Sequence, residues 1–130
     1  MNRLPDWEPR LADYLASVLH APHAYGSHDC ALHGANAVLA VTGVDRGAAF
    51  RGRYTTEIGA ARALKKHGAG TLEATFDAQL PMIPPALAQR GDLVLAQGAI
   101  GVCVGGEAMF AGAAGLERIG RAQWTRAWRV

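Results

Sequence analysis

The sequence predicts an α+β domain in which N-terminal helices pack on one face of a C-terminal antiparallel sheet. Half of the 130 residues are apolar and only 18% are charged, so the chain can bury a hydrophobic core. Apolar residues recur at helical spacing in the first half of the chain. The second half consists of short apolar runs separated by glycine, as in hairpin-connected strands. We therefore expect residues 1–130 to form a single domain.

Two helices are predicted in the first third of the chain. Residues 6–19 have an amphipathic pattern, and Asp6 is placed to cap their N-terminus. Residues 30–42 are the second helix, with Asp29 as N-cap and Gly43 in the position that ends it. Alanine, valine and leucine occupy nearly every side of this second helix, so we expect it to be buried at the centre of the fold.

A third helix is predicted to start at a cap, Thr55 or Thr56, and to end at His67, because basic residues in its last turn complement the helix dipole. Before it, residues 45–50 are expected to add a short helical turn. After it, residues 71–80 fit either a short helix or a strand, since so short a run does not distinguish the two.

The strands of the expected antiparallel meander follow, over residues 92–97, 99–104, 107–111, 116–119 and 127–130. Near the end of the chain, arginines alternate with tryptophans. We interpret this run as the last edge strand, with tryptophan packed inward and arginine solvated, and nucleic-acid binding by stacking and charge is the alternative. The residues concerned are Arg118, Arg121, Arg126 and Arg129 with Trp124 and Trp128.

Composition excludes several classes of protein. The formal charge of +2 is too small to indicate nucleic acid or an anionic membrane as partner. No apolar run approaches the length of a membrane-spanning helix, and residues 1–10 lack the apolar core of a signal peptide, so we expect a cytoplasmic protein. Two cysteines cannot build a disulfide framework, and Cys30 and Cys103 are expected to be free thiols.

Cys30 is the candidate nucleophile. It is the first residue of the second helix and directly follows its Asp29 cap. The helix dipole and the free backbone N–H groups at this position favour the thiolate, which is the reactive form. A buried structural thiol at a helix start is the competing interpretation.

Three segments resemble the NlpC/P60 family of papain-like cysteine peptidases and amidases. Residues 25–31 (Tyr-Gly-Ser-His-Asp-Cys-Ala), preceded by Pro22, resemble the family's nucleophile segment. Residues 90–95 (Arg-Gly-Asp-Leu-Val-Leu) are similar to its Gly-Asp-Leu-Val-Phe-Phe strand. Residues 100–105 (Ile-Gly-Val-Cys-Val-Gly) are similar to the strand that follows its catalytic histidine. The resemblance covers residues 22–111 and implies a papain-like fold with Cys30 in the nucleophile's place.

The rest of the family's catalytic triad is missing. Ala99 stands where the family has its histidine, and the resemblance implies that Ala99 faces Cys30. The third polar position of the family falls at Phe110 or Ala111, neither of which can orient an imidazole. A thiol without a general base loses both its activation and the protonation of its leaving group.

Other histidines could replace the missing base. His33 lies three residues after Cys30 on the same side of the helix, and His28 lies two residues before it. The alternative is that His28 is a loop residue and His33 a partly buried polar one. Histidine and cysteine are also dense enough here to suggest zinc, but their spacing matches no recognised site, so neither a metal nor a cofactor is predicted. The residues considered for zinc are His20, His23, His28, Cys30 and His33.

So compact a version of the fold is similar to small proteins encoded among phage and prophage tail genes. The resemblance implies a tail-tip or tail-assembly component that uses an incomplete NlpC/P60-like site for contacts with other tail or baseplate proteins. Such a protein would be found in the bacterial cytoplasm during assembly and then in the virion tail. The alternative is an active cysteine peptidase or amidase that cleaves a tail protein or the stem peptides of peptidoglycan.

Overall fold

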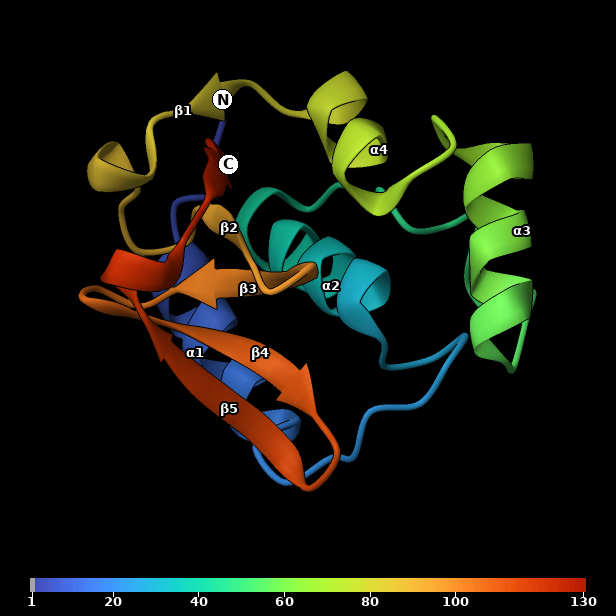
Figure 1. Cartoon of the computed structure of the whole chain (residues 1–130). Helices are drawn as coiled ribbons and strands as arrows, with labels where there is room; N and C mark the ends of the chain where they lie inside the picture. Colours follow the sequence, from blue (N-terminus) through green and yellow to red (C-terminus); the bar gives the residue numbers. More distant parts are fainter. Residues whose placement is uncertain (1) are drawn as a thin grey trace.

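An antiparallel sheet carries the helices of residues 7–17, 30–42 and 72–79 on one of its faces, and the helix of residues 57–67 stands beside them, away from the sheet (Figure 1). The computed structural model describes residues 2–130. Over these residues the helices are α1 (Trp7–Ser17), α2 (Cys30–Thr42), α3 (Glu57–His67) and α4 (Leu72–Gln79). The strands are β1 (Met82–Ile83), β2 (Leu93–Ala96), β3 (Ala99–Cys103), β4 (Glu107–Gly112), β5 (Gly115–Gly120) and β6 (Arg126–Trp128), with 3₁₀ turns η1 (Pro85–Leu87) and η2 (Arg121–Gln123). The predicted α+β class is confirmed.

The helix ends follow the predicted caps in most cases. Asp29 accepts a hydrogen bond from the Leu32 N–H, and Gly43 ends α2 in the left-handed conformation at φ +79°. Thr56 caps α3 in the same manner. Residues 71–80 form a helix, α4. One expectation is wrong, because the Asp6 side chain makes no capping hydrogen bond. The short helical turn expected before α3 is present over residues 46–50, where the N–H groups of Phe50 and Arg51 donate to the Gly47 carbonyl oxygen.

The main core lies between the sheet and α2. This helix packs on α1 on one side and on β3 and β4 on the other, as expected for a central helix. Ile100 and Val102 of β3 are fully buried in this core. At Gly34 of α2 a Cβ would come within 2.8 Å of the Ile100 Cγ2 atom, so the missing side chain lets helix and strand approach closely. None of the helices in residues 2–130 is both long and apolar enough to cross a bilayer.

A second cluster covers the opposite face of the sheet, which we call the outer face. It contains Val94, Cys103, Phe110 and Trp124, and Ala99 packs against it. Residues alternate between faces along a strand, so Cys103 and Ile100 point to opposite sides of β3. Cys103 is therefore separated by the sheet from α2, and both cysteines are free thiols.

The last strand is not at the edge of the sheet. The strand order is β1-β6-β2-β3-β4-β5, so β6 lies between β1 and β2, and every pairing is antiparallel. The predicted meander holds for β2 to β5, whereas the predicted edge strand is wrong. Trp128 is buried, and its ring packs on Phe76 of α4 with centroids 5.5 Å apart.

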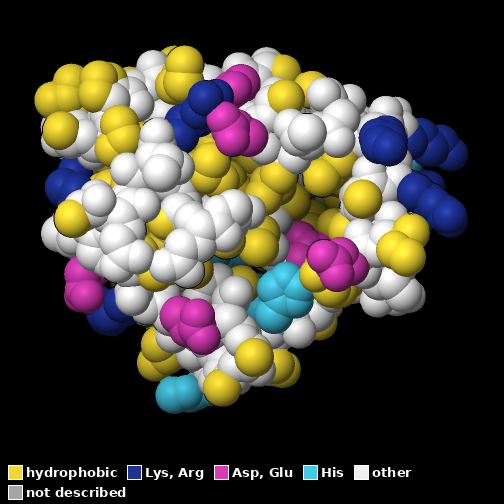
Figure 2. Space-filling view, in the orientation of Figure 1, with side chains coloured by type: hydrophobic (Ala, Val, Ile, Leu, Met, Phe, Trp, Pro, Cys, Tyr) yellow, Lys and Arg dark blue, Asp and Glu magenta, His cyan; other side chains and the backbone are white. Residues whose placement is uncertain are grey.

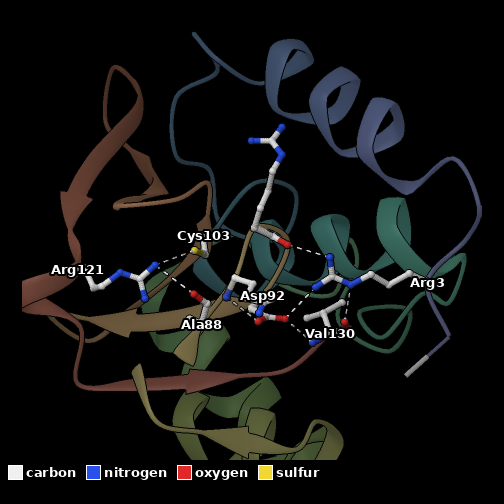
Figure 3. Close-up of polar contacts among 8 residues, drawn as sticks. Arg3, Ala88, Asp92, Cys103, Arg121 and Val130 are labelled. Atoms are coloured by element: carbon white, nitrogen blue, oxygen red, sulfur yellow. Dashed lines mark hydrogen bonds and ion pairs between the residues drawn. The ribbon is translucent and has the colours of Figure 1, made fainter. Parts of the chain in front are cut away.

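Two of the C-terminal arginines, Arg121 and Arg126, bind the protein's own groups. Arg126 pairs with Glu73 and Asp77 of α4. The Cζ atom of Arg121 lies 4.5 Å from the centroid of the Trp124 ring, and the Arg121 guanidinium donates a hydrogen bond to the Gly105 carbonyl oxygen. It also donates to the carbonyl oxygen of Ala88 (Figure 3). These internal partners engage the guanidinium groups of Arg121 and Arg126, so neither is free for nucleic-acid binding.

Asp92 joins distant parts of the chain (Figure 3). Its carboxylate is buried and accepts hydrogen bonds from the Arg3 guanidinium and from the backbone N–H groups of Val130 and Gln89. Arg3 also donates to the carbonyl oxygen of Val130, with an Nε to O distance of 2.8 Å. A buried carboxylate with a cation and two N–H donors is fully satisfied, so Asp92 of the Gly-Asp-Leu-Val segment has a structural role.

Candidate functional site

The turn before α2 positions the candidate nucleophile. Ala24 and His28 exchange two backbone hydrogen bonds, and Gly26 lies between them at φ +87°. A Cβ on Gly26 would come within 1.9 Å of the Tyr54 carbonyl oxygen. The turn is thus pressed directly against the backbone of the segment that leads to α3, and only glycine fits there.

Asp29 locks this turn to α2. One carboxylate oxygen accepts from the Leu32 N–H, and the other accepts from the Gly26 N–H and, at 2.6 Å, from the Tyr54 hydroxyl. Burial and the bond to this carboxylate hold the pKa of Tyr54 above its ordinary value, so Tyr54 remains a donor. Asp29 therefore fixes the backbone on both sides of Cys30 but has no free oxygen for chemistry.

Cys30 opens into a pocket of about 270 Å³ between the start of α2 and α3. Figure 2 shows this side of the molecule hollowed beside α3, with yellow apolar side chains inside and magenta acidic and cyan histidine side chains at the border. The apolar side chains that line the pocket are Ala31, Ala60, Ala61, Leu64 and Leu72, and the polar ones are His23, Tyr25, Asp29, Tyr54 and Glu57.

The Cys30 thiol is not activated by its surroundings. Burial raises its pKa, and the Asp29 carboxylate raises it further. Hydrogen bonds from the backbone N–H groups of Ile100 and of Cys30 itself lower the pKa, but by less than burial and Asp29 raise it. The helix N-terminus was expected to favour the thiolate, and desolvation outweighs that effect.

Ala99 does not face Cys30, so this expectation is wrong. Ala99 is paired with Ala96 across the β2–β3 hairpin and packs on the outer face with it. The next residue, Ile100, faces α2, and its backbone N–H is the group that reaches the Cys30 sulfur. A histidine at position 99 would consequently start from the wrong face of the sheet.

His33, the first alternative base, is engaged in the core. Its Nε2 atom is 2.9 Å from the Met109 carbonyl oxygen, which can only accept, so Nε2 carries the proton. Its Nδ1 atom, 2.7 Å from the Tyr14 Oη atom, then accepts from that hydroxyl. Burial lowers the pKa of His33 to about 4 and raises that of Tyr14 to about 12, which keeps both side chains neutral. With both ring nitrogens in use, His33 cannot take the Cys30 proton.

His28, the second alternative base, lies outside the pocket lining. Its ring packs edge-to-face on His33 with centroids 5.5 Å apart, and its side chain is buried. Within residues 2–130 neither of its ring nitrogens has a hydrogen-bond partner. Burial lowers the pKa of His28, and the nearby His23 lowers it further. The neutral ring therefore fills space behind the turn.

The histidine that shares the pocket with Cys30 is His23, which sequence reasoning considered only as a zinc ligand. Its backbone N–H donates to the Gly112 carbonyl oxygen, and its ring packs edge-to-face on Tyr25 at 4.6 Å. The one feature of the sequence that could have indicated this position is that His23 belongs to the loop directly before α2. Across residues 2–130, no group of three or more His, Cys, Asp or Glu side chains is arranged to hold a metal ion.

The two buried histidines predict that the protein loses stability in mild acid. Both pKa values are lowered in the folded state, so the unfolded chain takes up protons near pH 6.5 while the folded chain does not. The stabilisation is complete above pH 6.5 and is lost as the pH falls towards 4. For His33 alone the loss is about 3 kcal/mol.

Urea unfolding at several pH values measures this loss. The exposed His20→Ala variant should retain the wild-type pH profile, whereas His33→Gln should flatten it. An equally steep profile in His33→Gln would show that His33 is not responsible.

Comparison with known proteins gives one family. A family model described as a domain of unknown function (DUF6950) matches residues 2–130. No curated protein and no solved structure matches the chain.

Proposed function

Because the chain belongs to the DUF6950 family, whose name states no activity, we propose a function from the site and from the resemblance of its motifs. The protein is a phage or prophage tail-tip or tail-assembly component that binds other tail or baseplate proteins through a catalytically incomplete NlpC/P60-like fold. The observation that carries this proposal is the state of Cys30. Its thiol opens into a pocket, yet its pKa is raised and no imidazole of residues 2–130 forms a hydrogen bond with it.

The resemblance supports the proposal in two segments. The Asp-Cys pair starts a helix that packs on an antiparallel sheet, and the Gly-Asp-Leu-Val segment enters β2 of that sheet. The outer-face position of Ala99 argues against carrying over the family's histidine position residue by residue. A fold that keeps the nucleophile's place without its base is suited to binding a chain segment and not to cleaving it.

The pocket beside Cys30 suits such a segment. Although half of its lining residues carry polar groups, most of the surface inside it is apolar, so it would receive an apolar side chain of the partner and exclude water around it. In a thiol hydrolase the corresponding pocket receives the substrate. In this protein the same pocket would bind a segment of the partner protein without cleaving it.

Alkylation of Cys30 tests the proposal. In a Cys103→Ser background, so that Cys30 alone reports, we expect iodoacetamide to react at neutral pH more slowly than with a free thiol, because the raised pKa leaves little thiolate. We also expect no hydrolysis of D-Glu-containing stem peptides, and retention of assembly into the parent particle by Cys30→Ala. An alkylation midpoint below neutral pH, or loss of assembly in a folded Cys30→Ala variant, would overturn the proposal.

A cysteine hydrolase is the second candidate, favoured by one observation: His23 lines the same pocket as Cys30. If the protein cleaves stem peptides or a tail protein, Cys30 would attack and His23 would be the general base. His23→Ala should then abolish turnover, and the exposed His20→Ala should not. Absence of turnover in the wild type decides for the binding function.

A further inference from the structure

The side of α3 that faces away from the Cys30 pocket carries a concentration of positive charge. Arg53, Arg62, Lys66 and His67 line one open groove of about 490 Å³, which we call the basic groove. No Asp or Glu is among the described residues that line it. In Figure 2 the dark blue side chains of this region gather at the α3 side of the molecule.

The charge is local and not neutralised. Residues 53–67 contain four Lys and Arg and one Glu, a formal charge of +3, whereas the whole chain has only +2. The single acid, Glu57, lines the Cys30 pocket instead. Other arginines of the molecule, such as Arg3, Arg51 and Arg126, are paired with carboxylates. Within residues 2–130 the basic side chains of the groove have no such partner, and all of them are exposed.

We propose that the basic groove binds an acidic segment of a partner protein. Several unpaired cations on one surface attract a ligand with several negative charges and speed its association. The groove is open and, at about 490 Å³, much larger than a single ion, which suits several side chains of an extended peptide better than one ion. The inference rests on the proposed function only in taking the partner to be a protein.

The residues that line the groove favour carboxylates over single-stranded nucleic acid as the ligand. Binding of bases needs exposed aromatic rings on which they can stack. Tyr54 is the one aromatic ring among the described lining residues other than His67, and it is buried with its hydroxyl bound to Asp29. The groove therefore offers charge without a stacking platform.

The basic groove and the Cys30 pocket lie on two sides of the same helix. Ala60, Ala61 and Leu64 face the pocket, while Arg62 and Lys66 face the groove, and Tyr54 lines both. A partner chain could thus contact α3 from both sides, with an apolar residue in the pocket and acidic residues in the groove.

Binding of a labelled oligo-glutamate peptide, followed by fluorescence anisotropy at low salt, tests the proposal. The triple variant Arg53→Glu, Arg62→Glu, Lys66→Glu should weaken binding about tenfold or more. The control triple Lys65→Glu, Arg90→Glu, Arg129→Glu changes the net charge equally at exposed positions outside the groove, and it should weaken binding about twofold at most. Circular dichroism verifies that both triples fold.

Three results would overturn the proposal. Equal weakening by both triples would mean attraction by net charge alone, and unchanged binding by the groove triple would place the peptide elsewhere. Tighter binding of an oligo-dT of equal charge would assign the groove to nucleic acid. Each outcome is separate from the Cys30 experiments, since alkylated protein can be assayed for peptide binding, and failure of peptide binding leaves the alkylation result standing.

Discussion

Gly26→Ala is expected to lower the free energy of unfolding by about 4 kcal/mol, the largest effect of any single substitution considered. The new Cβ would lie 1.9 Å from the Tyr54 carbonyl oxygen. Each of these atoms is fixed to the main chain, so a side-chain rotation cannot relieve the clash. A left-handed φ of +87° adds conformational strain of about 1 kcal/mol. Relief requires the turn to move away from Tyr54, which breaks the bonds that Asp29 makes to Gly26 and Tyr54.

Gly52→Ala is the matched control. Gly52 also has a positive φ, +67°, and its N–H donates to the Gly26 carbonyl oxygen, but no atom lies within 4 Å of its added Cβ. Only the conformational strain applies, so the expected loss is about 1 kcal/mol. Urea unfolding of both variants measures the difference. Similar losses in the two would show that the turn yields easily, and that the contact with Tyr54 does not fix the position of Cys30.

His33→Ala is expected to lower the free energy of unfolding by about 3 kcal/mol, nearly as much. The substitution empties a fully buried volume and removes the ring that accepts from the Tyr14 hydroxyl and donates to the Met109 carbonyl oxygen. The exposed His20→Ala should change the unfolding free energy by less than about 0.5 kcal/mol. A small loss of unfolding free energy in His33→Ala would show that the His33 ring is not needed for stability, and His33 would again be a candidate general base.

The sequence predicted the elements that local signals determine. Asp29 and Gly43 mark the ends of α2 because a cap and a left-handed glycine act within a few residues. The nucleophile's position at the start of a buried helix followed from the same signals. What local patterns could not determine was the partner of each side chain: His33 binds Met109, 76 residues away.

The face of Ala99 depends on a register that the motif does not contain. Gln97 and Gly98 both have positive φ and form the two-residue turn between β2 and β3. This turn pairs Ala96 with Ala99, so Ala99 must share the face of Ala96. Aligning this segment with a family motif does not show which residues pair across the hairpin. A shift of the register by one residue moves every side chain of the strand to the other face of the sheet.

The position of β6 was also beyond the sequence, because an alternation of apolar and polar residues is the same in an edge strand and an inner one. The order of strands follows from which surfaces remain to be covered after the helices pack. Here the buried Trp128 and the Arg126 pairs with α4 bring β6 between β1 and β2.

The place of β6 between β1 and β2 determines how late the sheet can be completed during folding. Residues 126–128 follow every other strand in the sequence, yet β1 has no neighbour without them and β2 lacks one of its two. During synthesis the hairpins of β2 to β5 can form early, since their contacts are local, whereas the remaining pairings wait for the last segment and close long loops. Until then one side of β2 is an open edge able to pair with another chain. Proteins of this topology should therefore complete their sheet late, and the slow phase of refolding should report the docking of β6.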